Sequence, residues 1–384
     1  MFTQFFRLSN CYFWYFAVLG LIVPFFGIYL DYLQFSSREI GEVLAVVTAT
    51  KIFGPSLWAM MADKTGKLLP IIQRGALWAF ICFCALFWLS GFWAVTIALT
   101  AFSLFYNAIL PQIEVVSLAS INRSPKFYGR IRLWGSIGFI VIAMATGQLI
   151  ESYSAAVFVP VGAFVLLLLW LTTLWIEAPV IKKASIEEES NLWPKICHLG
   201  FILFFIAGLL LQVSFGPYYS FFGLYVLQLD YPGIAVGGFM VIGVIAEVGI
   251  FIAAGKIFKH SSIKQLLVIS LLLTALRWYL TAISADSLIL LALAQVLHAA
   301  GFGLYHSASM QFIQRHFAQN QQNRGQAIYI SGVYGVGGAL GAYLAGIYWL
   351  DGQGAEHSFT LAAIASLIAA ALALLIPKQK NTGQ

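Results

Sequence analysis

One carboxylate, Glu247, lies inside an otherwise apolar stretch at residues 236–259. The basic residues of this stretch, Lys256 and Lys259, come only after the apolar run. An apolar helix of about 20 residues is long enough to cross the ~30 Å hydrocarbon core of a membrane. Glu247 then lies near mid-membrane, where a carboxylate costs at least a few kcal/mol unless it is protonated, paired or hydrated. This position predicts a role in a path for solute or protons.

Three further ionisable residues lie inside apolar stretches of the second half: Arg277, His298 and His306. We predict that Glu247, Arg277 and His298 couple proton movement, because burial and a nearby arginine act in opposite directions on the charge of a carboxyl group. An imidazole changes charge near neutral pH and can relay the proton. His306 follows His298 by eight residues, about 80° around a helix, so both can border one broad solute cavity. Each histidine can instead be a hydrogen-bonded packing residue.

In the first half, Lys51 lies twelve residues before Asp63, which places it roughly 18 Å into a helix. A lysine at that depth is costly, and we predict that it binds the carboxylate of a substrate. The alternative is a lysine that snorkels or pairs structurally. Glu114 and Arg132 lie at neighbouring span ends and can pair at low dielectric, either to bind solute or only to hold two helices together.

The composition indicates a membrane protein. Of the 384 residues, 61% are hydrophobic and 9% are charged, whereas a soluble domain has about 25% charged residues. The net charge of +6 is explained by basic cytoplasmic loops and does not require a nucleic-acid partner. The four cysteines suit core packing, no third ligand has a suitable spacing for a metal site, and no cofactor is predicted.

The hydropathy pattern predicts an all-α chain with twelve transmembrane helices. The expected spans are 10–30, 40–61, 69–90, 92–120, 131–150, 155–176, 197–227, 233–254, 264–284, 286–312, 327–350 and 356–377. The long polar gap after residue 177 divides them into six and six. We therefore expect a bundle over 1–177, a cytoplasmic linker over 178–195 and a second bundle over 196–384. A glycine-rich run at 331–341 is expected to allow close helix packing.

With the N-terminus in the cytoplasm, 18 of the 21 basic residues fall on the cytoplasmic side. The exceptions are Arg38, in an outer loop, and Lys51 and Arg277, inside spans. This distribution predicts that both termini are cytoplasmic.

The loop after the second span resembles the loop signature of the major facilitator superfamily. The matching residues are Asp63, Lys64, Gly66 and Lys67. Ala59 and Leu68 depart from the signature. The resemblance implies a conformational latch on the cytoplasmic side that does not select the substrate; the alternative is an ordinary charged turn. For the fold it implies two six-helix bundles around a central cavity that rock between outward- and inward-open states.

The segments 111–114 and 128–136 resemble the lactose permease branch, in which the counterparts of Glu114 and Arg132 bind sugar. Phe139 takes the place of a sugar-stacking tryptophan of that branch. Gln295 and Gly301 take the places of a lysine and a glutamate. The missing glutamate shifts the predicted coupling to Glu247, Glu114 and the histidines.

Resemblance is closest to the 3-phenylpropionate permease family. It rests on the segments 128–136, 243–251 with Arg277-Trp278, and 295–298 with Phe302 and His306. It implies proton-coupled uptake of an aromatic carboxylate across the bacterial inner membrane, by a protein that works as a monomer. A sugar, oligosaccharide or nucleoside is the alternative solute. A polytopic membrane enzyme is a rival class, but no catalytic acid–base set is present, and the two-halved plan argues against a channel.

Overall fold

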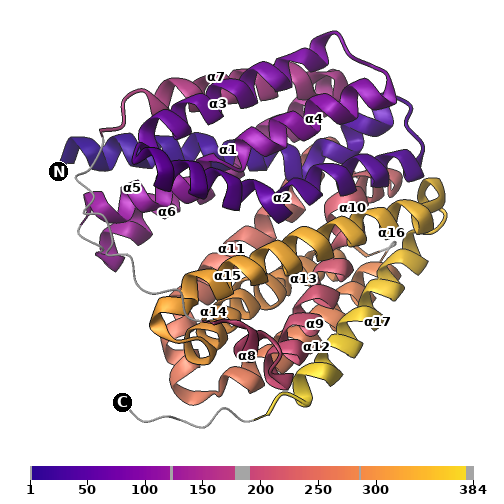
Figure 1. Cartoon of the computed structure of the whole chain (residues 1–384). Helices are drawn as coiled ribbons and strands as arrows, with labels where there is room; N and C mark the ends of the chain where they lie inside the picture. The colour runs from indigo at the N-terminus through magenta and orange to yellow at the C-terminus, as the bar shows by residue number, and fades with distance from the viewer. Residues whose placement is uncertain (1, 122–123, 178–190, 285–286, 378–384) are drawn as a thin grey trace. The chain divides into compact units, whose positions relative to one another are not determined.

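The computed structural model describes residues 2–121, 124–177, 191–284 and 287–377 (Figure 1). Regular structure in these ranges is helical throughout, as predicted. Twelve helices or helix pairs in the described ranges are long and apolar enough to span a membrane. They are Thr3–Tyr32, Ser37–Ala62, Leu68–Phe87, Phe92–Ser120, Phe127–Ser152, Ala155–Thr173, Leu199–Gln228, Gly233–Ala253, Ile263–Ile283, Leu288–His316, Gln319–Gly352 and Ala355–Leu374, here numbered span one to span twelve.

By packing, the chain forms two compact units. The first contains Met1–Ser185 and Tyr218–Val241, and the second contains Ile186–Pro217 and Ile242–Gln384. The halves predicted above are defined by a linker in the sequence, whereas these units are defined by packing. The two divisions differ at the end of span seven and the start of span eight, which the packing assigns to the first unit.

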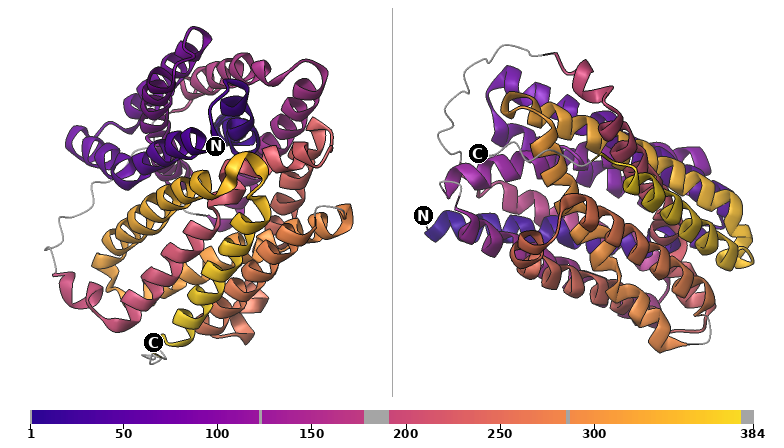
Figure 2. Two further views of the ribbon diagram at one scale, coloured as in Figure 1. Left: turned by 90° about the vertical axis from the view of Figure 1, so that its right-hand side faces the viewer. Right: turned by 90° about the horizontal axis from the view of Figure 1, so that it is seen from below.

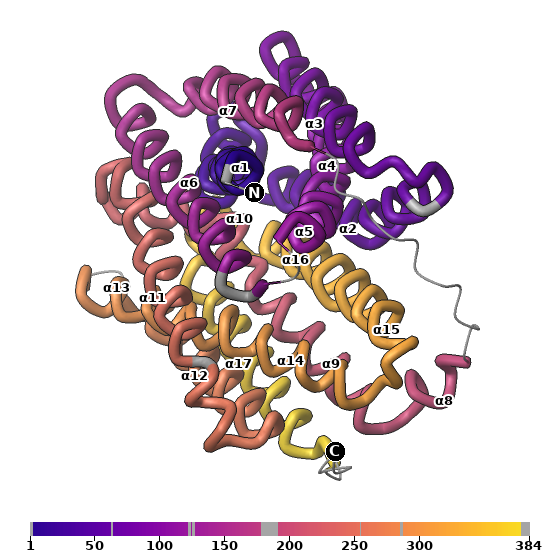
Figure 3. Tube along the Cα trace, turned by 90° about the vertical axis from the view of Figure 1, so that its left-hand side faces the viewer, coloured from indigo at the N-terminus to yellow at the C-terminus, as the bar shows by residue number. Residues whose placement is uncertain are grey.

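In the first unit, α1 is the central helix. Figure 3 shows it end-on with α6 and α7 beside it, and these two helices make extensive contacts with α1. Span four is divided into α4 and α5. The helices of this unit are α1 (Phe2–Tyr32), α2 (Ser37–Thr65), α3 (Leu68–Cys84), α4 (Phe92–Tyr106), α5 (Ile109–Ser120), α6 (Pro125–Ser152) and α7 (Phe158–Thr173), followed by most of α10 (Gly216–Gln228) and the start of α11 (Gly233–His260).

In the second unit, α17 packs along both α12 and α9, and it stays beside α12 in both views of Figure 2. Spans ten and eleven each contain a π-helical segment, Ala300–Leu304 and Ile330–Gly337. Besides the rest of α11, the helices are α8 (Trp193–Ile196), α9 (Leu199–Ser214), α12 (Ile263–Ile283), α13 (Leu288–Val296), α14 (Tyr305–His316), α15 (Gln322–Tyr329), α16 (Gly338–Trp349) and α17 (Ala355–Leu374).

Local sequence signals set several helix ends. Ser36 and Glu39 form a capping box at the start of α2, so that each side chain accepts a hydrogen bond from a backbone N–H of the other residue. Gly66 ends the same helix in the left-handed conformation, with φ +65°, which glycine adopts without strain. The tight turn expected at Gly66 is therefore present.

Helices of the first unit approach closely where glycines meet. A Cβ on Gly138 of α6 would clash with the Phe13 backbone of α1, and a Cβ on Gly237 of α11 would clash with Ala143 of α6. Small residues allow such close backbone contact in membrane helices, where van der Waals packing replaces hydrophobic burial as the driving force. These contacts hold α1, α6 and the start of α11 in fixed register. They thereby position the side chains that α1 and α6 contribute to the candidate site of the first unit.

Candidate functional site

Glu114 of α5 lies at the centre of a polar cluster in the first unit. The Tyr128 hydroxyl of α6 donates a hydrogen bond to Glu114 Oε1 at 3.2 Å. Tyr12 of α1 is fully buried, and its phenol lies close enough to Glu114 and Arg132 to interact with both charges. Three helices thus converge on the carboxylate, and Tyr12 and Tyr128 are members of the cluster that the sequence did not indicate.

Arg132 of α6 is held by an aromatic ring. Its guanidinium carbon lies 3.8 Å from the centroid of Phe16, which is cation–π geometry. One turn away, a Cβ on Gly135 would lie 2.6 Å from Phe16 and 3.1 Å from Arg132 Nη1, so a glycine leaves room for this contact. Glu114 and Arg132 interact electrostatically, but no direct ion pair joins them among the described residues.

Lys51 of α2 follows directly after a buried hydrogen-bonded group. Thr50 Oγ1 lies 2.9 Å from Ser103 Oγ and accepts a hydrogen bond from Asn107 Nδ2 at 2.9 Å, which fixes α2 against α4. Lys51 itself is exposed and has no hydrogen bond or ion pair with any described residue. An ammonium without a protein partner in the middle of a span needs water or an anion to compensate its charge.

Phe139 of α6 is only 9% exposed. Its backbone carbonyl lies against Gly20 of α1, where a Cβ would clash with it. In this conformation Phe139 is therefore part of a helix interface. Of the predicted latch, Lys64 and Lys67 are exposed, and the side chain of Asp63 lies outside the described residues.

In the second unit, span ten carries a stack of three rings. The ring of Phe302 lies between those of His298 and His306, with centroid distances of 5.5 and 6.4 Å and interplanar angles of 11° and 13°. The π-helical segment Ala300–Leu304 separates the histidines. Its hydrogen bonds run from residue i to i+5, so the helix turns less per residue there. The 80° separation expected for a regular α-helix is thereby reduced, and the rings stack.

Glu247 of α11 lies against the same part of span ten. A Cβ on Gly303 would lie 3.1 Å from Glu247 Cγ, and a Cβ on Gly243 would lie 3.2 Å from the His298 ring. Gly243 and Glu247 are four residues apart and share one face of α11. The structure thus brings Glu247 and His298, two of the three predicted coupling residues, to one helix interface.

Arg277 of α12 is completely buried. Its Nε donates to the Ala294 carbonyl at 3.1 Å and its Nη2 to Gln295 Oε1 at 3.2 Å. The guanidinium carbon lies 4.1 Å from the ring centroid of Trp278 and 5.5 Å from that of Phe215. Arg277 and His298 are connected through Phe215, whose ring centroid lies 6.0 Å from the imidazole.

His306 also has a polar partner on another span. Its Nδ1 lies 3.1 Å from the Tyr334 hydroxyl, in the π-helical segment Ile330–Gly337 of span eleven. Single-turn π bulges occur frequently at functional sites. For the glycine-rich run at 331–341 the sequence predicted only close helix packing. The contact of Tyr334 with His306 was not predicted. The signal present was that Tyr334 is the only aromatic residue of the run.

Comparison with models of protein families shows to which family the chain belongs. A family model described as "MFS_1 like family" matches residues 5–361. The chain belongs to the MFS_1 like family.

Relatives of this family member cover nearly its whole length. The Probable 3-phenylpropionic acid transporter of Escherichia coli (strain K12) is 27% identical over 93% of this chain and 94% of its own. The maltose permease of Geobacillus stearothermophilus is 26% identical over 97% of this chain and 94% of its own. A crystal structure of the nucleoside transporter NupG shares the fold, with a TM-score of 0.82, 20% identity and coverage of 98% of this chain and 100% of that chain.

These comparisons confirm three predictions. The chain has the twelve-helix fold of the major facilitator superfamily. It is a transporter and not a membrane enzyme. It is a multi-pass membrane protein whose partners include a small-molecule solute.

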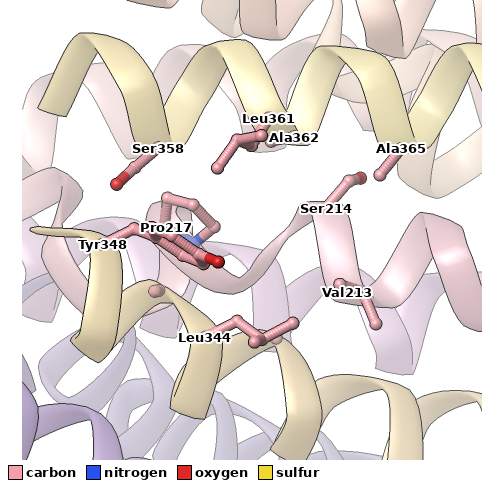
Figure 4. A pocket seen from close by; sticks show the side chains of 11 residues that line it. Val213, Ser214, Pro217, Leu344, Tyr348, Ser358, Leu361, Ala362 and Ala365 are labelled. Atoms are coloured by element: carbon pink, nitrogen blue, oxygen red, sulfur yellow. The ribbon is translucent and has the colours of Figure 1, made fainter. Parts of the chain in front are cut away.

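An apolar crevice in the second unit of this transporter lies apart from the candidate site residues described above. The cavity of about 240 Å³ is lined by residues of α9, α16 and α17 and by Pro217, as Figure 4 shows. Its lining includes Ser214 and Ser358 but none of the candidate site residues. The described residues also contain no group of three or more His, Cys, Asp or Glu side chains able to hold a metal ion.

Proposed function

We propose that this transporter takes up a small aromatic carboxylate together with protons, by alternating access. The observation that carries the proposal is Lys51, a lysine in the middle of span two whose ammonium group has no hydrogen bond or ion pair with any described residue. A solute carboxylate supplies the anion that such a cation needs, and a charge-assisted hydrogen bond is about twice as strong as a neutral one. Arg132, with Phe16 behind it, and Glu114 complete the polar groups proposed for solute binding in the first unit.

The second unit supplies the proposed coupling groups. Glu247 adjoins the ring stack on span ten, and His298, at one end of that stack, shares Phe215 with Arg277. A carboxyl group and an imidazole are side chains that gain and lose protons under physiological conditions when their surroundings change. We assign Glu247, Arg277 and His298 to proton coupling. His306, with its Tyr334 partner at the other end of the same stack, is proposed to link these groups to the bound solute. Phe139 is proposed to contact solute only in a conformation that exposes its ring.

The similarity to a Probable 3-phenylpropionic acid transporter supports an aromatic carboxylate as the solute. A second candidate is a sugar or nucleoside, which the similarity to a maltose permease and the shared fold with a nucleoside transporter support. A neutral solute needs no cation, so the two candidates make different demands on Lys51.

Uptake into membrane vesicles tests the proposal. Labelled 3-phenylpropionate, maltose and a nucleoside are offered separately, with and without an imposed pH gradient, acidic outside. We expect accumulation of 3-phenylpropionate that collapses when a protonophore dissipates the gradient. Accumulation of maltose or the nucleoside alone would replace the proposed solute, and uptake of 3-phenylpropionate that ignores the gradient would remove proton coupling.

We further propose that the protein works as a monomer in the bacterial inner membrane. In this arrangement a cytoplasmic linker over 178–195, of which residues 178–190 lie outside the described residues, joins the bundles over 1–177 and 196–384, and Asp63, Lys64, Gly66 and Lys67 form a cytoplasmic latch. The charge distribution predicts that both termini are cytoplasmic. Topology reporters fused at Gly91 and Asp351 should therefore report the outer side. A cytoplasmic signal from either fusion would contradict this arrangement.

A further inference from the structure

A second cavity of the second unit lies at the ends of α12, α14 and α17, away from the candidate solute and coupling residues. Its volume is about 560 Å³. The lining residues include Lys264, Ile269, Arg315, Leu374 and Ile376. This lining has two basic side chains and no acidic one, and most of the remainder is apolar.

The two cations differ in what they already bind. Lys264 Nζ donates to the Ile376 carbonyl at 2.8 Å, just beyond the end of α17, and an ammonium has two further protons to donate. Arg315, in the last turn of α14, is exposed and has no hydrogen bond or ion pair with any described residue. Both side chains can therefore bind an anion at the mouth of the cavity.

The apolar part of the cavity opens toward the outer surface of the helices. Ile269 is 45% and Leu374 57% exposed. Ile269 begins a stripe of exposed residues along α12, at intervals of three and four: Ile269, Leu272, Leu276, Tyr279 and Ile283. Apolar residues at this spacing share one face of a helix, and on a spanning helix an exposed apolar face contacts lipid. The cavity thus continues into the lipid-facing surface.

We propose that this cavity binds one anionic phospholipid, with its phosphate at Lys264 and Arg315 and an acyl chain over Ile269 and Leu374. Ile269 lies five residues after Lys264, roughly 7.5 Å along the helix, which separates the charged and apolar parts as a phospholipid requires. Basic pockets between membrane helices on the cytoplasmic side favour anionic head groups. In the proposed topology this end of α12 is cytoplasmic, so the lipid comes from the inner leaflet.

The consequence is that an anionic lipid bridges α12, α14 and the end of α17. Lys264 already joins α12 to the last carbonyls beyond α17, and a phosphate shared with Arg315 adds α14 to the same contact. The bound lipid is therefore expected to stabilise the second unit against thermal unfolding. This proposal does not depend on which solute is transported.

Native mass spectrometry of the full-length protein tests the site, with dioleoylphosphatidylglycerol as the probe and dioleoylphosphatidylcholine and inorganic phosphate as comparisons. We expect one phosphatidylglycerol to bind roughly 25-fold more tightly than phosphatidylcholine, because Lys264 and Arg315 each contribute about five-fold toward an anionic lipid. Arg315→Gln should lower the preference for phosphatidylglycerol over phosphatidylcholine by about five-fold. The double change Lys264→Gln with Arg315→Gln should abolish nearly all of this preference.

The matched control is Lys256→Gln with Lys259→Gln, which removes two exposed lysines at the end of α11 that do not line the cavity. This variant should keep the preference for phosphatidylglycerol. An equal loss in the control would show general surface attraction and overturn the site. Equal affinity for the two lipids, or displacement of the lipid by millimolar inorganic phosphate, would overturn it as well. Arg315 is exposed, so the single variant tests the site even where the double variant fails to fold.

Discussion

The ionisable clusters of the two units differ in the kind of charge that they offer. The first unit presents two cationic side chains, Lys51 and Arg132, and the side chain of Glu114, which accepts a hydrogen bond from a tyrosine hydroxyl. The second unit presents two imidazoles stacked on a phenyl ring, with Glu247 beside them and a buried arginine. One cluster is suited to hold an anion, and the other is suited to change its charge.

This difference leads to a division of labour that mutation can test. We expect changes in the first cluster to act on solute binding, and changes in the second to act on coupling to the pH gradient. The distinction is measurable, because exchange of labelled solute across the membrane needs solute binding and the conformational change of the loaded carrier, whereas accumulation against a gradient needs coupling as well.

The largest effect is expected at Lys51. Lys51→Ala should lower both exchange and accumulation of an aromatic carboxylate by about 100-fold, the order expected when a solute charge loses its desolvated partner. Lys51→Arg should retain part of the binding, since the charge survives although its geometry changes. Initial uptake rates, corrected for the amount of protein in the membrane, measure both. Unchanged uptake by Lys51→Ala would assign Lys51 to a structural role.

A change at Glu247 is expected to lower accumulation of solute without lowering its exchange. Glu247→Gln mimics the protonated carboxyl group, so solute should still bind and exchange at near wild-type rates. Accumulation driven by a pH gradient should fall by about ten-fold or more, because the variant carries no exchangeable proton at this position. Vesicles that still accumulate solute would show that Glu247 is not the coupling acid, and Glu114 would be tested next.

A smaller effect is expected when the His306–Tyr334 hydrogen bond is removed. A net contribution of about 1 kcal/mol corresponds to roughly a five-fold change. Tyr334→Phe should therefore lower the accumulation ratio by about five-fold and leave exchange nearly unchanged. Tyr343→Phe, which alters an exposed tyrosine on α16, serves as the control. A loss of exchange equal to the loss of accumulation would place His306 in solute binding alone.

The smallest effect is expected for Tyr128→Phe. The hydrogen bond from Tyr128 to Glu114 is 3.2 Å long, which exceeds the usual range for an O–H···O bond and makes it weak. The KM for solute should rise by about two-fold, with an unchanged ratio of accumulated to external solute at saturation. A change in that ratio larger than the change in KM would contradict the division between the two clusters.

The order and length of the helices were predictable from hydropathy. Span seven was expected at 197–227 and is found at Leu199–Gln228, and span nine was expected at 264–284 and is found at Ile263–Ile283. The reason is physical: a membrane helix must satisfy its own backbone hydrogen bonds, so a sufficiently long apolar run has one structure available to it. The division of span four at Tyr106–Ile109 and the π-helical segments of spans ten and eleven left no signal in hydropathy.

The sequence predicted several residues of the candidate site, but it did not predict which residues they contact. Glu247, Arg277 and His298 were recognised because an ionisable residue in a span is expensive. Some residues that contact the ionisable side chains were not recognised. Phe215, beside Arg277 and His298, and Tyr12 and Tyr128, beside Glu114, are uncharged or amphipathic residues that cost little in a membrane, so only the packing of the helices singles them out.

The sequence by itself determined that this chain crosses the membrane repeatedly, that it is a transporter of the major facilitator type, and which ionisable side chains lie within the spans. These conclusions depend on solvation and on short motifs, which act locally along the chain. Tertiary structure alone decided that Arg132 rests on Phe16, that Glu247 meets His298 across a glycine-lined helix interface, and that Phe302 lies between two histidines. Such contacts depend on the rotation and register of whole helices, which many distant residues set together.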